Sequence, residues 1–404
     1  RPPRSTHCIS SAASDVYKRQ DHHLRTGNSL IGATTNDLRR PPSGKSFEIG
    51  LWESKLVEDL GKAIHYLDLI KESVSDSRLD IEAKKEEWEL VNAWIGKYKQ
   101  AADVWLSPHF GNKLSDDDYA QMIGAAAENR IGKVSDRPFF SRAQEIAARV
   151  HFFHWELEFP DVFFNRFGRP LDNPGFHAVI GNPPYGSNID SLAKQWLRQR
   201  YRASGTTLDN FALFLELAIQ LTRKKGSIGE IVPSGWLTAR EHLPLRTVLL
   251  FQTCPKKIVH MPYDVFPEAY IDTVVWISEK IENSCPCERF KVLVKRFGHR
   301  EKVCQMPQQL EDYQVVQGSG WLSDPQKLII TDAGPGQWLG RWIRSPYFML
   351  TDNLLSVSRG ITPFVKPKPE ETHVIALGFF GSINRYALET KEFAPVVYLS
   401  LIHI

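Results

Sequence analysis

The spacing of apolar positions changes about halfway along the chain. Between about residues 37 and 150 they recur every three to five residues, as at Leu51, Leu56 and Leu60, which predicts amphipathic helices. After Pro174, short apolar runs of strand length alternate with helical stretches. This alternation predicts a doubly wound, mainly parallel α/β sheet.

The elements expected after Pro174 are separated by short segments rich in Gly, Pro and Lys, which predict turns and loops. Residues 176–180 are an apolar run that ends at Gly181, and they predict a buried strand. The other predicted strands are residues 228–232, 257–261 and 273–277, and the predicted helices are residues 209–223 and 243–251. Beyond about Glu282 the periodicity weakens, so we expect a separate module there.

Composition narrows the class of protein. The chain has 404 residues, of which 42% are hydrophobic, and it carries 50 Lys and Arg against 47 Asp and Glu. This length suits two or three domains with a core, and no apolar run is long enough to cross a membrane. Five cysteines do not make a disulfide framework, which favours a reducing, cytoplasmic setting.

The two ends of the chain do not read as natural protein. Residues 399–404 can be written as the codons CTG TCT CTT ATA CAC ATC, and the reverse complement of that DNA translates as residues 15–20. This string is the transposon end used in sequencing adapters, and residues 1–14 continue the adapter upstream. We therefore expect residues 1–20 and 399–404 to be artefacts, and residues 21–398 to be a fragment of a longer protein.

This interpretation changes the meaning of the formal charge of +3. Residues 1–20 hold four basic side chains and one acidic side chain, whereas residues 399–404 hold none of either. The natural segment is therefore neutral, and overall charge gives no argument for a nucleic-acid partner.

The strongest chemical signal is the tetrapeptide of Asn182, Pro183, Pro184 and Tyr185, which follows the strand predicted at residues 176–180. It would lie at the carboxyl end of a parallel strand, where open α/β sheets bind ligands. An Asn carboxamide oxygen and a backbone carbonyl can each accept one N–H bond from an exocyclic amine. Such bonds localise the nitrogen lone pair, and the aromatic ring can stack on the base.

An ordinary Asn-Pro turn after a strand is the alternative. The tetrapeptide should arise by chance in roughly 0.002 of sequences with this composition. Its place directly after a strand lowers that frequency further, so we favour the functional interpretation.

Five segments resemble adenine-N6 DNA methyltransferases of the type IIG restriction–modification class and the related phage-exclusion (BREX-like) methylases. They are DHHLRTGNSLIGA (21–33), FHWELEFPDVF (153–163), GFHAVIGNPPYG (175–186), DNFALFLELAIQLTRKKGSIGEIVPSGWL (209–237) and VFPEAYIDTVV (265–275). The resemblance implies a Rossmann-like, S-adenosylmethionine-dependent methyltransferase sheet. It also implies double-stranded DNA as partner, S-adenosylmethionine as cofactor and a bacterial or archaeal cytoplasm as location.

The resemblance also assigns roles to single residues. Asn182 and the Pro183 carbonyl would hold the target amine, and Tyr185 would stack on an adenine that is flipped out of the duplex. Phe266 would supply a second aromatic contact to that base. Asn28 falls where the family places a polar contact to the cofactor adenine, although an Asn after Gly also forms turns.

Two departures from the family pattern stand out. The residue before the Ala-Val-Ile strand is usually acidic, whereas here it is His177, more simply a structural residue at the start of the strand. No Gly-rich loop of the D-P-x-C-G-S-G kind, which cradles the methionine part of the cofactor, occurs in residues 21–398. We therefore expect the fragment alone to be inactive. A nuclease domain would belong to the missing N-terminal part.

The natural segment then divides into four expected regions. Residues 21–36 would form a cofactor-side strand and loop, and residues 37–150 a helical insertion. Residues 151–281 would form the catalytic core, and residues 282–398 would begin the DNA-recognition region, with 354–365 resembling the opening of a target-recognition domain.

A basic stretch in residues 291–302 is a candidate surface for DNA phosphates. Its cationic side chains are Lys291, Lys295, Arg296, Arg300 and Lys302. A solvated edge strand protected by charge is the competing interpretation.

Metal and nuclease sites have weaker support. Cys285 and Cys287 form the one close cysteine pair, whereas structural zinc sites use paired arms, so we expect no metal. Glu-x-Lys triplets at residues 53–55, 82–84 and 389–391 lack the Pro-Asp partner of a nuclease centre.

Two rival functions stay open at this stage. The same tetrapeptide chemistry could act on a protein glutamine or on RNA, although the long insertion and the downstream module argue against such compact enzymes. A non-catalytic DNA-recognition protein is the second rival, but it would not need an acceptor pair for an amine.

Overall fold

The computed structural model describes residues 24–45, 50–72, 78–186, 189–262, 265–266, 271–282, 290–298, 312–331, 374–376 and 397–399. The chain forms two compact units, Arg1–Gly334 and Pro335–Ile404. In the second unit, β7 (Val374–Ala376) and β8 (Val397–Leu399) pair in parallel. Leu399, the first residue of the predicted C-terminal adapter, is thus part of β8, whereas residues 1–20 and 400–404 lie outside the described residues.

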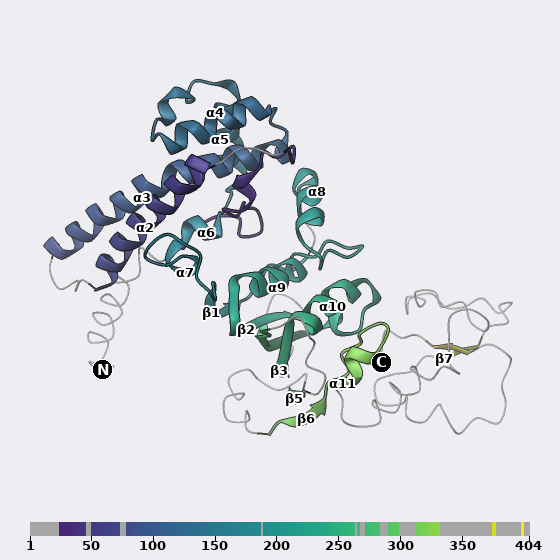
Figure 1. Cartoon of the computed structure of the whole chain (residues 1–404). Helices are drawn as coiled ribbons and strands as arrows, with labels where there is room; N and C mark the ends of the chain where they lie inside the picture. Colours follow the sequence, from purple (N-terminus) through teal and green to yellow (C-terminus); the bar gives the residue numbers. More distant parts are fainter. Residues whose placement is uncertain are drawn as a thin grey trace, which may run out of the picture. The chain divides into compact units, whose positions relative to one another are not determined.

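In the described part of residues 37–150, where a helical insertion was predicted, four α-helices are present beside short 3-10 turns. They are α2 (Gly50–Glu72), α3 (Arg78–Leu106), α4 (Asp116–Ala127) and α5 (Pro138–Val150). The first two run side by side as a long hairpin, and α4 and α5 pack at one end of it (Figure 1). Apolar residues at helical spacing form the seam, among them Leu60, Ile64 and Ile95.

Short helical segments connect the larger elements. They are η2 (Asp37–Arg39), η3 (Ser107–Phe110), η4 (Ile131–Lys133), α6 (Trp155–Glu158), α7 (Pro160–Phe163), α8 (Ser191–Arg200), η5 (Ser234–Leu237), η6 (Arg240–His242) and α11 (Ser319–Ser323). The N-terminus of α8 is capped by Asp190, whose side chain accepts a hydrogen bond from Leu192 N.

The predicted α/β class is confirmed, in the form of a six-stranded mixed sheet. The expectation of a mainly parallel sheet is wrong, because three of the five strand pairs are antiparallel. Its strands are β1 (Phe176–Gly181), β2 (Thr222–Pro233), β3 (Thr253–His260), β4 (Thr273–Lys280), β5 (Lys291–Arg296) and β6 (Gln314–Gln317), in the order β1-β2-β4-β3-β5-β6. The first two strands are parallel, and β4 lies antiparallel between β2 and β3. The described part of the β3–β4 connection holds no helix that could cross the sheet, so β4 returns antiparallel.

Two helices cover one face of this sheet. They are α9 (Asn210–Leu221), which leads from β1 toward β2, and α10 (Leu243–Gln252), which leads from β2 to β3 (Figure 1). Side chains from both helices form one apolar cluster with strand residues such as Ile228, Val232 and Trp276. This cluster is the core beneath the carboxyl end of β1.

Two further expectations from the sequence are wrong in detail. The strand at residues 176–180 is not buried, because β1 is at the edge of the described sheet and Ile180 is 85% exposed. The catalytic sheet also does not end at residue 281, because β5 and β6 continue it. An apolar run indicates strand propensity, but partners far along the chain decide whether a strand is central or at an edge.

Candidate active site at the carboxyl end of β1

The tetrapeptide leaves the sheet where β1 ends. Gly181 is the last residue of the strand and pairs with Glu230 of β2. Directly after it, Asn182 is exposed and Pro183 is buried. The loop is tied to the N-terminus of α9, because Asn210 N donates to the Gly186 carbonyl at 3.0 Å. The tetrapeptide therefore follows a strand end, as the sequence predicted, and its loop is also tied to the start of a helix.

Tyr185 connects the tetrapeptide to the neighbouring strand. Its hydroxyl oxygen lies 3.3 Å from Asn182 Oδ1 and 3.2 Å from the Ile231 carbonyl oxygen of β2. One hydroxyl proton can be donated to only one of these acceptors at a time. Partial burial, and after it the negative charge of Glu230, raise the pKa of Tyr185, so the phenol stays protonated as a donor.

Phe266 lies against the tetrapeptide although it is distant in the sequence. Its ring centroid is 5.9 Å from that of Tyr185, and the two ring planes meet at 89°. Edge-to-face pairs of this kind are favourable for aromatic rings. The structure thus brings together the two aromatic residues that the sequence assigned to one base.

Asn28 and the tetrapeptide line the same cavity, which has a volume of about 680 Å³. This volume lies in the range of roughly 300–1,000 Å³ that is common for small-molecule sites. Asn28 and Pro184 both line it. The Asn28 carboxamide oxygen accepts a bond from Leu30 N at 3.3 Å, so this residue shapes its own turn and faces the cavity as well.

Residues 154–156 hold the Asn28 segment in place. His154 Nδ1 accepts from Ala33 N at 3.0 Å, and Trp155 Nε1 donates to the Ser29 carbonyl at 2.9 Å. Glu156 Oε2 accepts from both the backbone N and the hydroxyl of Thr35. Residues 154–156, which we call the HWE clamp, therefore hold in place the segment that forms one wall of the cavity.

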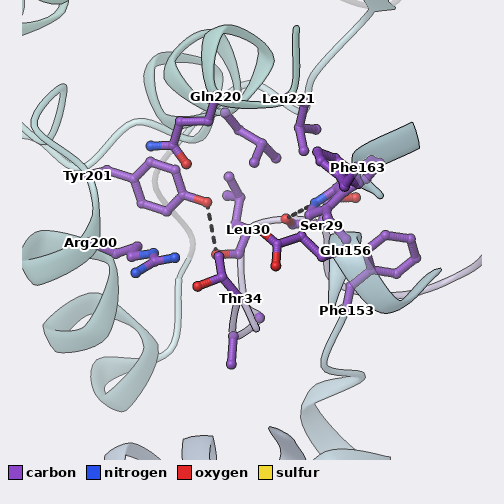
Figure 2. Close-up of a pocket in the computed structure, with 14 residues that line it drawn as sticks. Ser29, Leu30, Thr34, Phe153, Glu156, Phe163, Arg200, Tyr201, Gln220 and Leu221 are labelled. Atoms are coloured by element: carbon purple, nitrogen blue, oxygen red, sulfur yellow. Dashed lines mark hydrogen bonds between the residues drawn. The ribbon is translucent and has the colours of Figure 1, made fainter. Parts of the chain in front are cut away.

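A second, smaller cavity of about 100 Å³ lies beside the same segment. Figure 2 shows Arg200, Tyr201 and Gln220 on one side of it and Phe153 and Phe163 on the other. The Tyr201 hydroxyl donates to the Leu30 carbonyl at 3.1 Å (Figure 2). Ser29 and Leu30 line both cavities, so their backbone separates the two spaces.

The structure describes only part of the basic stretch. Lys291, Lys295 and Arg296 lie on β5, whereas Arg300 and Lys302 lie outside the described residues. Because β5 pairs with both β3 and β6, the interpretation as an edge strand is wrong. Arg296 donates to the Thr331 hydroxyl at 3.1 Å, so a tertiary contact already orients it.

The weaker candidates from the sequence lie away from the tetrapeptide or outside the described residues. His177 is exposed on the edge strand β1. Among the described residues, no group of three or more His, Cys, Asp or Glu side chains could hold a metal ion. Cys254 is buried, whereas Cys285 and Cys287 lie outside the described residues. No helix in the described part of the chain has the length and apolarity to cross a membrane.

Sequence reasoning missed several residues around the larger cavity. Phe110 and Arg149 reach its wall from the helical insertion, and Asp190 and Asn210 reach it from the segment after the tetrapeptide. Nothing local in the sequence distinguishes these four from ordinary surface or core residues. Glu230 was missed because it stands in an apolar strand pattern.

Comparisons with known proteins find similarity to restriction-modification methyltransferases. The family model described as Eco57I restriction-modification methylase matches residues 58–266. A Methanocaldococcus jannaschii protein described as a type II restriction enzyme and methyltransferase is 32% identical over 128 residues, covering 32% of this chain and 10% of that protein. The type II restriction enzyme and methyltransferase RM.Eco57I of Escherichia coli is 30% identical over 84 residues, 20% of this chain and 8% of that protein. The matches thus span a tenth or less of these relatives' length.

Solved structures give distant likenesses. The type IIG restriction endonuclease BpuSI is 16% identical with a TM-score of 0.33, and the match covers 84% of this chain and 46% of that chain. The methyltransferase subunit of a type I restriction-modification system from Streptococcus thermophilus is 13% identical with a TM-score of 0.30, covering 80% and 98%.

Proposed function

The chain belongs to the Eco57I restriction-modification methylase family, and we propose that it is the catalytic part of a site-specific, adenine-specific DNA methyltransferase. The whole protein would transfer a methyl group to adenine N6 in restriction–modification or in phage defence. Its setting would be the cytoplasm of a bacterial or archaeal cell. The observation that carries this proposal is the amide of Asn182 at a strand end beside the paired rings of Tyr185 and Phe266.

Two acceptors of the chain hold the target amine in this proposal. Asn182 Oδ1 accepts one N–H of the exocyclic amine, and the Pro183 carbonyl accepts the other. Proline has no N–H of its own near that carbonyl. Because both hydrogens are engaged, the nitrogen lone pair withdraws from the purine ring and becomes nucleophilic.

The aromatic pair holds the base itself. Adenine N6 is not reachable inside the duplex, so the nucleotide must be flipped out. The face of Tyr185 would stack on the flipped base, and Phe266 would contact its edge. Stacking of this kind contributes about 1–3 kcal/mol per base, which offsets part of the cost of flipping.

The residues around the larger cavity fit the nucleoside part of S-adenosylmethionine. The cavity has the volume for it, and the polar Asn28 and the ring of Pro184 both face it. Bound there, this cofactor would supply the methyl group. Asn28 would contact the cofactor adenine, and the HWE clamp would keep Asn28 in place.

The phosphate backbone of the DNA would be bound outside the site that holds the amine. We propose that Lys291, Lys295 and Arg296 contact the phosphate backbone, together with Arg300 and Lys302. Residues 282–398 would contribute to recognition of the DNA sequence. A nuclease domain would lie in another part of the whole protein.

The 404-residue chain lacks the Gly-rich loop of the family, and we propose that it is inactive alone. The test compares this chain with the whole protein in transfer of tritiated methyl groups from S-adenosylmethionine to DNA. Transfer by the whole protein to adenine N6, and none by the chain alone, is the expected result. Transfer to a protein glutamine or to RNA in place of DNA would reject the proposal.

A further inference from the structure

Glu230 is a buried carboxyl group to which the proposed reaction gives no role. It lies in β2 between Gly181 of β1 and Trp276 of β4, and only 3% of it is exposed. Ile228 and Val232, which flank it on the same face, belong to the apolar core beneath α9 and α10. A carboxyl group at such a position costs stability unless it is hydrogen-bonded.

The Glu230 side chain leans toward the tetrapeptide. A Cβ atom added to Gly181 would lie 2.4 Å from Glu230 Oε2 and 2.7 Å from Oε1. The carboxyl group therefore fills the space that a side chain at position 181 would need. Because Gly181 is bonded directly to Asn182, Glu230 reaches the strand end from which the amine acceptor projects.

Two further observations set Glu230 apart. Its Oε2 atom is enclosed, and no hydrogen-bond donor among the described residues reaches it, although buried polar atoms normally have partners. Burial raises the pKa of Glu230 to about 7, and no charged group of the described chain adds to that shift. The charge of Glu230 acts on Tyr185, where it contributes to the raised pKa of the phenol.

We propose that the Glu230 carboxylate assists methyl transfer electrostatically, by stabilising the positive charge that the target nitrogen acquires. This inference rests on the proposed function. The amine nitrogen forms its bond to the methyl carbon with its own lone pair, while the methyl–sulfur bond breaks and its electron pair stays on sulfur. The nitrogen remains cationic until it releases one proton to water. A fixed negative charge in a water-poor site lowers the energy of that state.

The first experiment measures kcat of the whole protein against pH, with wild type and Glu230→Gln compared. The wild-type rate should rise as Glu230 ionises, with a midpoint near pH 7. At pH 8 the variant should be at least about tenfold slower, and near pH 5.5 the two rates should converge. Glu279→Gln is the matched control, because Glu279 lies in β4 opposite Ser227 and is ion-paired with Lys256.

The second experiment displaces the carboxyl group without removing it. Gly181→Ala adds a methyl group only 2.4 Å from the present position of Oε2, so the flexible end of Glu230 must move away. This variant should also lose the rise in rate with pH. The double variant with Glu230→Gln should be no slower than the slower single variant. Capture of a flipped 2-aminopurine, read by fluorescence, should be unchanged in Glu230→Gln.

The outcomes separate this inference from the proposed function. A Glu230→Gln protein with the wild-type rate and pH profile would overturn the inference and leave the proposed function standing. A loss of rate that is equal at every pH would indicate a structural role only and would also overturn it. Whole protein that does not methylate DNA adenine would overturn both.

Discussion

Tyr185 and Phe266 meet edge to face in the free protein, with ring centroids 5.9 Å apart and planes at 89°. An adenine that stacks on the Tyr185 face would meet the Phe266 ring at one side. The pair therefore forms a corner for a flat base, built from the strand end of β1 and the segment between β3 and β4.

Loss of one wall of this corner should weaken capture of the base. We expect Phe266→Ala to reduce the capture of a flipped 2-aminopurine by the whole protein by about 1–3 kcal/mol. Titration of the fluorescence against DNA concentration measures this loss. Phe297→Ala is the control, because Phe297 packs in a separate cluster with Val259. An unchanged fluorescence response would reject the stacking role of Phe266.

Removal of the Tyr185 hydroxyl separates stacking from amide orientation. Tyr185→Phe keeps the ring but loses the contacts to Asn182 Oδ1 and to the Ile231 carbonyl. One hydrogen bond contributes about 1 kcal/mol, so we expect roughly fivefold slower methylation and normal capture of 2-aminopurine. A parallel loss in both assays would mean that the hydroxyl supports the ring and does not orient the amide.

Asn182→Ala should remove the amine acceptor. We expect the kcat of the whole protein to fall by roughly 100-fold or more, because an acceptor aimed at the reacting group acts mainly in the transition state. Duplex binding should persist. Tritium transfer and a gel-shift assay measure the two effects. Asn36→Ala is the control, because Asn36 is exposed and its side chain caps no helix. Retained activity would mean that the amine is held elsewhere.

The raised pKa of Glu230 predicts how stability changes with pH. In the folded chain its pKa is about 7, against an ordinary value of 4.5. Between these values the folded state keeps a proton that the unfolded state has released, so stability falls as pH rises. At pH 8 we expect Glu230→Gln to be more stable than wild type by up to about 3 kcal/mol, and near pH 4 by almost nothing.

Urea unfolding of the 404-residue chain at both pH values measures this difference. The assay does not depend on methyl transfer. A constant difference between the two proteins from pH 4 to pH 8 would mean that Glu230 titrates normally in the folded chain.

The helical hairpin contains a buried ion pair whose loss should be costly. Lys97 Nζ lies 2.8 Å from Asp59 Oδ2, and the Tyr98 hydroxyl donates to the same carboxylate at 2.7 Å. Asp59→Ala leaves the buried Lys97 charge without this partner, so we expect a loss of about 3–5 kcal/mol in unfolding free energy. Urea unfolding measures it.

The adjacent Glu58→Ala variant is the control for that loss. Glu58 pairs with Lys55 and Lys62 at the surface, where water and salt screen the charges. Its removal should cost much less than removal of Asp59. Equal losses would contradict the importance of burial.

The sequence by itself determined the local features of this protein. Helical spacing in residues 37–150 predicted the helices that are present, and short apolar runs predicted strands at the right positions. The NPPY tetrapeptide after one such run predicted the candidate site and suggested a chemistry for it. These signals are local, because side-chain periodicity and turn residues report the conformation of neighbouring residues.

Only the tertiary structure decided which of these features meet. It brought Phe266 to Tyr185 and opened a cavity between Asn28 and Pro184. In the described sheet it also made β1 an edge strand and β5 an interior one, and it placed the Glu230 carboxyl group beside the candidate site. Strand order and pairing register depend on contacts between distant segments, and no local pattern encodes them.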